Sequence, residues 1–378
     1  MKKGSIFTIS TILLNSSLTI MVGSVIAPAL PEIVKNLKFD FAPGLLVTLP
    51  SLGVVFFSLI AGRLINKIGP FKLLSLGLIP YGILGFIGLF LTNNYLLILD
   101  RLLLGAACVA IQISVTTFIA QLYEGKERLK IIAWQGMAIE LGGVIFLSLG
   151  GFLGEQSWQY PFYIYLIAIL FFFLSWKSLP KTTSTTTTEN QNSTKTIKKN
   201  RTIYPILIGS FFSMAIFFVC YVNLPHYLPE KFNFSESYTG YFMSSISLIA
   251  VLVASQLPKI IEKVGSNNTV SLGFFFFSIG YFVFGLASAS WLMGLGVIAT
   301  GIGFGFTVPL LNHMIVDNSN SQNRGKNLGL YSMMVFSGQF CATFTEFLPT
   351  SMNISFLYVG FIGIAVSILL IILFKKFK

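Results

Sequence analysis

Long apolar runs alternate with short polar breaks along the whole chain. A helix needs about 20 mostly apolar residues to cross the hydrocarbon core of a bilayer, and these runs are long enough. The runs are continuous rather than alternating residue by residue, which excludes a transmembrane β-barrel. The pattern therefore predicts an all-α membrane protein with twelve transmembrane helices, at residues 6–29, 43–65, 72–92, 95–121, 130–153, 159–178, 203–227, 238–261, 269–289, 291–315, 327–348 and 353–374.

The composition excludes an ordinary soluble protein. Of the 378 residues, 54% are hydrophobic and only 10% are charged, whereas soluble domains average about 25% charged residues. The three cysteines lie inside apolar runs and show no metal-ligand or disulfide spacing, so we predict no metal site and no cofactor. Two histidines and thirteen acidic residues leave little material for catalysis. We therefore expect a protein that is not an enzyme and has no catalytic residues.

The basic residues predict the orientation of the chain in the membrane. The net charge is +12, which on its own is also typical of nucleic-acid-binding proteins. If the N-terminus is inside, however, only Lys35, Lys38 and Lys231 fall on the outer side, Arg101 lies within a span, and every other lysine and arginine falls on the inner side. This distribution follows the positive-inside rule, and it lacks the clustered basic face of a nucleic-acid site. We expect a multi-pass protein of the bacterial inner membrane with both termini in the cytoplasm and no nucleic-acid partner.

One polar segment, at residues 179–202, interrupts the apolar pattern. It contains a threonine-rich run at 182–188 and ends with the basic residues Lys198, Lys199 and Arg201. Such a segment cannot bury enough apolar surface to fold. We predict a flexible cytoplasmic linker that joins one six-helix bundle at 1–178 to a second at 203–378. A regulated or partner-binding loop is the alternative for the same segment.

The two halves repeat each other. Lys67 and Gly69 recur as Lys263 and Gly265, and Arg128 recurs as Arg324, each 196 positions later. The repeats occupy equivalent places in the predicted topology, so they indicate an internal duplication. Two related six-helix bundles with a cavity between them are the architecture of alternating-access carriers.

The loop after the second span carries a family motif. Residues 62–72 resemble the loop 2–3 signature of the major facilitator superfamily. The matching positions are Gly62, Lys67, Gly69 and Lys72. In that family an acidic residue of the motif helps to hold the inner ends of the two bundles together, but here Asn66 takes its place and cannot pair as a charge. The equivalent loop of the second half has Glu262 before Lys263, so the resemblance implies an inner gate that rests more on Glu262.

The fourth span resembles one branch of that superfamily. It opens with Asp100 and Arg101, and Gly105 follows four residues after the arginine. This is similar to the span 4 motif of the drug:proton antiporters, in which the arginine is linked to proton transfer. The resemblance carries that role to Arg101 and implies twelve helices in two pseudo-symmetric bundles.

The fifth span matches the antiporter signature only in part. It keeps the glycines at 142, 150 and 151, but Phe146 and Leu147 stand where the signature has a Gly-Pro pair. This departure favours an importer or a uniporter as the alternative to an antiporter.

Polar residues within the spans are the candidates for the site. Glu140 lies ten residues into the fifth span, roughly 15 Å deep at the helical rise per residue. A charged group at that depth is costly, which makes Glu140 and Arg101 candidates for proton coupling. The alternative for Glu140 is a neutral side chain hydrogen-bonded between helices. The alternatives for Arg101 are an ion pair with Asp100 at the outer interface, or a side chain that extends to the interface. Four further side chains are expected either to line the substrate cavity or to form interhelical hydrogen bonds: Asn15, Gln112, Gln135 and Gln339.

These observations together favour a secondary active transporter. We expect proton-coupled efflux of a small amphipathic compound by alternating access, with the substrate, protons and the lipid bilayer as its only partners and a monomer as its oligomeric state. The alternative is a proton-coupled importer or a uniporter of a small nutrient or metabolite. A membrane enzyme or sensor is disfavoured because the sequence has no nucleotide-binding loop and no paired carboxylates at a defined spacing.

Overall fold

The computed structural model describes residues 6–181, 203–319 and 323–377. Nearly all of these residues lie in helices, and no strand occurs among them. This confirms the predicted all-α fold, which follows because only helices satisfy every backbone group within one segment in lipid. The predicted linker at 179–202 lies outside the described residues except for its first three positions.

The first half of the chain forms eight α-helices and two short 3-10 helices. Their bounds are α1 Ile6–Ser24, η1 Ala27–Ala29, α2 Leu30–Leu37, α3 Leu45–Ile68, α4 Pro70–Ile87, η2 Gly88–Phe90, α5 Asn94–Leu122, α6 Gly125–Gln156, α7 Tyr160–Ile164 and α8 Ile167–Ser178. We call residues 6–181 the N-terminal half.

The second half forms seven α-helices and one 3-10 helix. Their bounds are α9 Ile203–Phe232, α10 Glu236–Ser255, α11 Leu257–Val264, α12 Ser266–Leu286, α13 Ser290–Asp317, α14 Arg324–Cys341, η3 Ala342–Phe347 and α15 Met352–Lys376. We call residues 203–377 the C-terminal half.

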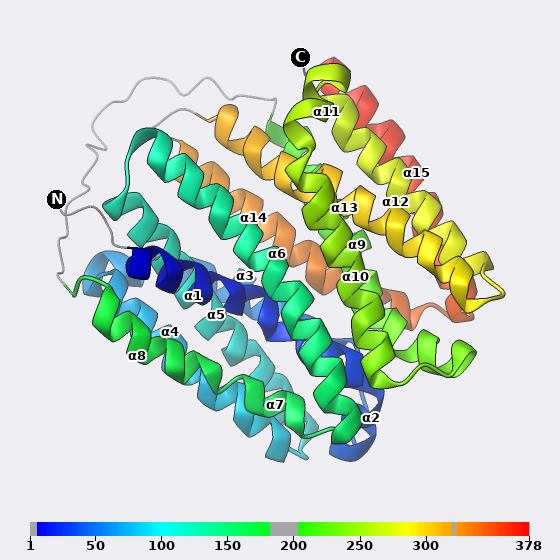
Figure 1. Ribbon diagram of the computed structural model, residues 1–378, viewed down its shortest axis with the longest axis horizontal. Helices are drawn as coiled ribbons and strands as arrows, with labels where there is room; N and C mark the ends of the chain where they lie inside the picture. Colours follow the sequence, from blue (N-terminus) through cyan, green and yellow to red (C-terminus); the bar gives the residue numbers. More distant parts are fainter. Residues whose placement is uncertain (1–5, 182–202, 320–322, 378) are drawn as a thin grey trace.

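Eleven spans in the described part of the chain are long and apolar enough to cross a membrane. The remaining predicted span, at residues 327–348, corresponds to α14, which has 18 residues. Its first turn contains Lys326 and Asn327, and these polar residues lower its hydrophobicity. It nevertheless packs against α3 and α9 as a full member of the bundle (Figure 1).

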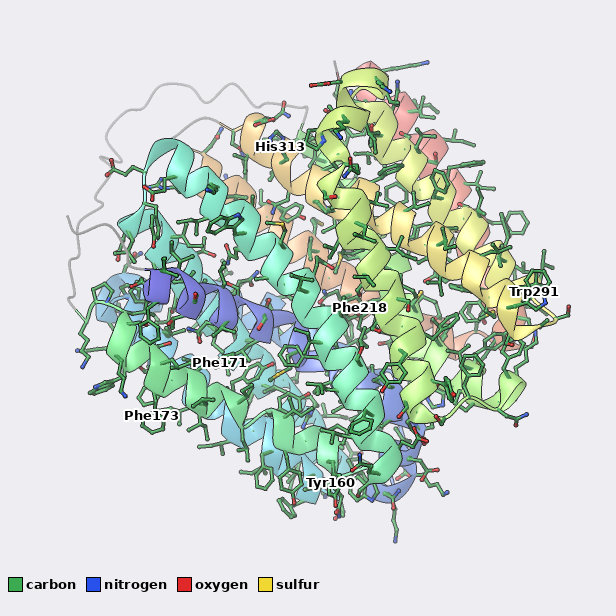
Figure 2. The ribbon with its side chains drawn as sticks, in the orientation of Figure 1. Tyr160, Phe171, Phe173, Phe218, Trp291 and His313 are labelled. Atoms are coloured by element: carbon green, nitrogen blue, oxygen red, sulfur yellow. The ribbon has the colours of Figure 1, made fainter. Side chains whose placement is uncertain are left out.

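The surface between the helix ends is apolar. Phe173 and Trp291 project from opposite sides of the molecule and are more than half exposed (Figure 2). Phe171 and Phe218 point inward and are nearly fully buried. A wide exposed apolar surface is costly in water but is matched to lipid.

The two halves meet mainly where α6 packs on α10 and where α3 packs on α14. Figure 1 shows that α6 and α10 lie close together at the end of the molecule that carries α2 and diverge toward the other end. We call these the α2 end and the linker end. At the closest approach, a Cβ built on Gly151 of α6 would lie 3.0 Å from the Cα of Gly240 of α10. Only residues without side chains permit this crossing.

Hydrogen bonds join the halves toward the α2 end. The Ser51 hydroxyl of α3 donates to Oε1 of Gln339 of α14 at 2.6 Å. One turn nearer the α2 end, the hydroxyls of Thr48 and Thr343 form a buried hydrogen bond. The bonded side chains therefore hold the two halves together at one end of the molecule.

Candidate functional site

The centre of the candidate site is Glu140, which lies midway along α6. Its side chain is half-buried. The carboxyl is close enough to the hydroxyls of Tyr221 in α9 and Tyr331 in α14 to interact with both electrostatically. Glu140 of the N-terminal half thus lies within electrostatic range of two phenols of the C-terminal half.

No cation pairs with Glu140 among the residues that the structure describes. The three ion pairs in this part of the chain are Lys35–Glu32, Arg101–Asp100 and His313–Asp317. An unpaired carboxylate in apolar surroundings is unfavourable unless it binds a proton or a cationic ligand. Glu140 therefore has no charged partner among the described residues in this state.

Aromatic side chains of α9 form one wall beside Glu140. The rings of Phe218 and Tyr221 stack with centroids 4.6 Å apart, and Phe217 packs on Phe304 of α13 with centroids 4.0 Å apart. The hydroxyl of Tyr221 is buried and lies within hydrogen-bonding reach of Ser247 of α10. Phe217, Phe218 and Tyr221 are only 2–3% exposed, so this aromatic wall is closely packed in this state.

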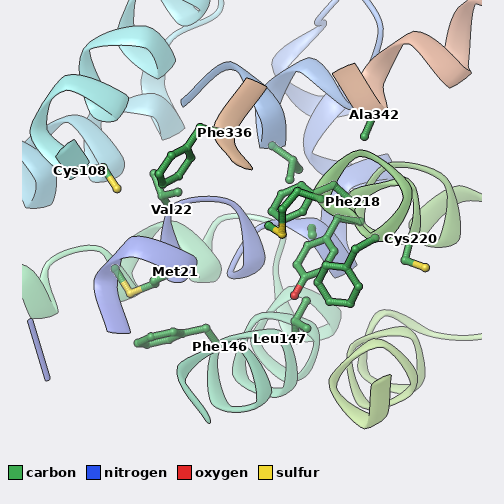
Figure 3. Close-up of a cluster of buried hydrophobic side chains, with 14 of the residues drawn as sticks. Met21, Val22, Cys108, Phe146, Leu147, Phe218, Cys220, Phe336 and Ala342 are labelled. Carbon is green, nitrogen blue, oxygen red and sulfur yellow. The ribbon is translucent and has the colours of Figure 1, made fainter. Parts of the chain in front are cut away.

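A buried apolar cluster lies between Glu140 and the α2 end. Figure 3 shows Val22, Phe146 and Leu147 of the N-terminal half together with Phe218 and Phe336 of the C-terminal half, all of them less than 7% exposed. Phe146 and Leu147 are the residues that replace the Gly-Pro pair of the antiporter signature. In this chain they contribute to a seal between the halves.

The structure places the four uncharged candidates differently. Gln339 lies at the interface of the halves, where it accepts a hydrogen bond from Ser51 of the other half. Asn15 is fully buried and donates to Ser175 of α8 at 2.8 Å, so its contact is interhelical and within the N-terminal half. Gln112 and Gln135 are half-buried and have no side-chain hydrogen bond in the described part of the chain.

Arg101 is not brought to Glu140. Its Nη2 lies 3.0 Å from Oδ2 of Asp100, and both side chains are less than 5% exposed. The guanidinium lies over the rings of Phe162 and Tyr165 at 5.7 and 5.8 Å. These contacts place Arg101 inside the N-terminal half near the α2 end, in the ion pair that was its alternative assignment.

Gly88 makes room for that ion pair. A Cβ built on Gly88 would lie 1.8 Å from Nη2 of Arg101. The backbone of Gly88 is helical, with φ −50°, so any residue fits the backbone but only glycine fits the space. Sequence reasoning missed this contact because the glycine precedes the arginine by thirteen positions in a separate element.

The residues of the loop motif lie at the linker end. Asn66, Lys67 and Lys72 are exposed, and Gly62 is half-buried. The Asn66 amide donates to the carbonyl of Gly62 in its own helix, at 3.4 Å. Asn66 thus bonds within α3 in this state.

The two equivalent loops share one backbone feature. Gly69 and Gly265 both adopt positive φ, 80° and 82°, and each lies between two helices. This conformation strongly favours glycine. Glu262 and Lys263 are exposed and form no ion pair in the part of the chain that the structure describes. The inner gate that the resemblance implies stays a prediction.

The sequence is similar to a known protein family and to several bacterial resistance proteins. The family description "Major Facilitator Superfamily" matches residues 12–343. The tetracycline resistance protein, class B, of Escherichia coli is 26% identical over 320 residues, which cover 81% of this chain and 79% of that protein. Multidrug resistance protein 2 of Bacillus subtilis is 25% identical over 283 residues, which cover 70% of each chain.

One more resistance protein matches part of the sequence, and solved transporters match the fold. The quinolone resistance protein NorA of Staphylococcus aureus is 28% identical over 152 residues, covering 40% of this chain and 39% of that protein. Among solved structures, a POT family transporter superposes with a TM-score of 0.81 at 14% identity, over 98% of this chain and 96% of the other. The E. coli xylose transporter XylE, in an inward-open conformation, superposes with a TM-score of 0.71 at 16% identity, over 96% and 95%.

These matches confirm the resemblance that the loop and span 4 motifs indicated. The family match extends over most of both halves, and the solved transporters share the fold across nearly the whole chain. The protein is a multi-pass membrane transporter, and the chain belongs to the major facilitator superfamily.

Proposed function

We propose that this transporter exports a small amphipathic compound in exchange for protons. The single observation that carries the proposal is the position of Glu140, an acid without a charged partner midway along α6 and within electrostatic range of two phenols of the other half. The similarity to tetracycline, multidrug and quinolone resistance proteins supports export rather than the importer or uniporter alternative.

The state of the structure supports an assignment of the two membrane sides. The halves are joined at the α2 end and diverge toward the linker end. The positive-inside rule places the linker end in the cytoplasm, so we assign this state as facing inward. We also assign the protein to the bacterial inner membrane with both termini inside, acting as a monomer because one chain supplies both walls of the site.

The exchange would proceed in two halves of a cycle. In the inward-facing state a substrate from the cytoplasm binds against the aromatic wall of α9, and Glu140 releases its proton. After the halves rock to face outward, a proton from outside binds Glu140 and the substrate leaves. Inward proton movement yields about 1.4 kcal/mol per pH unit and about 2.3 kcal/mol per 100 mV, enough to drive a substantial substrate gradient.

Glu140→Gln tests this assignment. Glutamine keeps the size and polarity of the side chain but cannot carry the proton. We expect loss of uptake into inverted vesicles with an acidic lumen, while binding of a fluorescent amphipathic drug to the purified variant is retained. The matched control is Glu127→Gln, which changes an exposed acid of the same helix and should leave driven uptake intact. Unchanged driven uptake by Glu140→Gln would refute the proposal.

A further inference from the structure

A carboxylate of each half contacts the beginning of a helix of the other half at the α2 end. In the first contact, the backbone N–H of Gly44 donates to both carboxylate oxygens of Glu346, at 3.0 and 2.9 Å. Gly44 is the residue before α3 and has no side chain to cap that helix. Glu346, from η3 of the C-terminal half, supplies the cap instead.

The second contact runs in the opposite direction. Oε2 of Glu155, near the end of α6, accepts from the Ser235 hydroxyl at 3.1 Å and from the Ser237 backbone N–H at 3.3 Å. Ser235 is the N-cap of α10, because its side chain also accepts from the N–H of Tyr238. Here the N-terminal half supplies the acid and the C-terminal half supplies the helix.

The two contacts occupy equivalent places in the topology of the two halves. Glu346 follows Glu155 by 191 positions, and Ser235 follows Gly44 by the same 191 positions. The helix α3 is the second long helix of its half, and α10 is the second long helix of the other. Each half therefore contributes one glutamate that caps a helix of the other half, and the two capped helices are equivalent.

A helix begins with unpaired N–H groups and a positive partial charge, so a carboxylate there is stabilising. Both contacts cross the boundary between the halves, so they exist only while the α2 end is closed. We propose that Glu155 and Glu346 form a reciprocal clasp that stabilises the state closed at the α2 end and so sets the balance between inward-facing and outward-facing forms. This inference rests on the alternating access of the proposed function, and it is independent of proton coupling at Glu140.

Gly44 offers a way to break one contact without removing a charge. A Cβ on Gly44 would lie 2.8 Å from Oε2 of Glu346 and 2.6 Å from Cγ1 of Val222. The φ of Gly44 is −59°, which any residue adopts, so alanine introduces no backbone strain. Gly44→Ala should displace the carboxylate while leaving the fold of α3 intact.

The experiment measures distances between paired spin labels in a variant whose three cysteines are replaced by alanine. One pair reports on the α2 end, at the exposed residues Thr92 and Ser288. A second pair reports on the linker end, at the exposed residues Lys130 and Ser255. All measurements are made in lipid nanodiscs at one fixed pH, without substrate or a proton gradient.

Glu155→Ala and Glu346→Ala should each raise the ratio of long to short distances at the α2 end by about two- to fivefold, the range for a charge at a helix terminus. The double variant should multiply the two effects, and the linker-end distances should shorten in parallel. Gly44→Ala should reproduce the effect of Glu346→Ala. The matched control is Glu230→Ala, an exposed acid on the same face, which should leave both distances unchanged.

Distance distributions of the double variant that match those of the parent would overturn the clasp. So would a change of equal size in Glu230→Ala, because the effect would then come from net charge rather than from the contacts. The proposed proton coupling is judged separately, by driven uptake through Glu140→Gln, so the two proposals can fail independently.

Discussion

The substitution Gly88→Ala would test how closely the buried ion pair of Asp100 and Arg101 is packed. The added methyl group would lie 1.8 Å from Nη2 of Arg101, so the guanidinium must move. It cannot move freely, because it is 1% exposed and lies over the rings of Phe162 and Tyr165. Displacement therefore lengthens its 3.0 Å contact with Asp100.

The expected cost follows from that geometry. Removing one partner of a buried ion pair costs about 3–5 kcal/mol. Gly88→Ala keeps both charges and only separates them, so we expect about 3 kcal/mol. At 2–4 °C per kcal/mol, this corresponds to a fall in melting temperature of roughly 6–12 °C. The measurement is the thermal unfolding of the detergent-purified protein, followed by the fluorescence of its tryptophans.

A second glycine provides the control. Gly294 of α13 has no atom within 4 Å of its Cβ position, so Gly294→Ala should leave the melting temperature unchanged or raise it, because alanine is the better helix former. If Gly88→Ala melts with the parent while Gly294→Ala behaves as expected, the ion pair is not confined as described here.

Two further predictions concern the ends of the transport path. Phe146→Ala removes a ring from the apolar cluster between the halves. Vesicles that contain this variant should therefore leak protons faster than vesicles with the parent, as followed by a trapped pH dye. An equal leak would show that the cluster does not seal the path. Asn66→Asp restores the acid of the loop motif, and an ionised carboxylate can pair with charges that an amide cannot. The linker-end distances of this variant should shift toward the short class, and an unchanged distribution would show that the acid is not required for the inner gate.

Much of the fold follows from sequence because the bilayer imposes a simple rule on it. Apolar runs must become helices, and the paired turns at Gly69 and Gly265 could be placed from the repeated motif alone. Glu140 could be singled out for the same reason, since a lone acid deep in an apolar run is conspicuous. Tyr221 and Tyr331 could be named as possible site-lining aromatics, but no local spacing could pair them with Glu140, because they come from helices of the second half.

The remaining features depend on contacts that no local spacing encodes. Glu346 meets Gly44 across 302 positions, and Asn15 meets Ser175 across 160. The sequence allowed both assignments of Arg101, and the packing of Phe162 and Gly88 around its ion pair with Asp100 could be seen only in the structure. A search for pairs of acids and helix starts at one constant spacing would have found the clasp residues.

The crossing of α6 and α10 at Gly151 and Gly240 has a mechanical consequence. Two bare backbones in contact have no side chains to interlock, so the angle between the helices can change there with little repacking. Glu140 lies eleven residues along α6 from this pivot, about 16 Å at the helical rise. A modest tilt about the glycine pair therefore moves the carboxyl several ångströms relative to the phenols of the other half. The angle between the halves thus determines the electrostatic surroundings of Glu140.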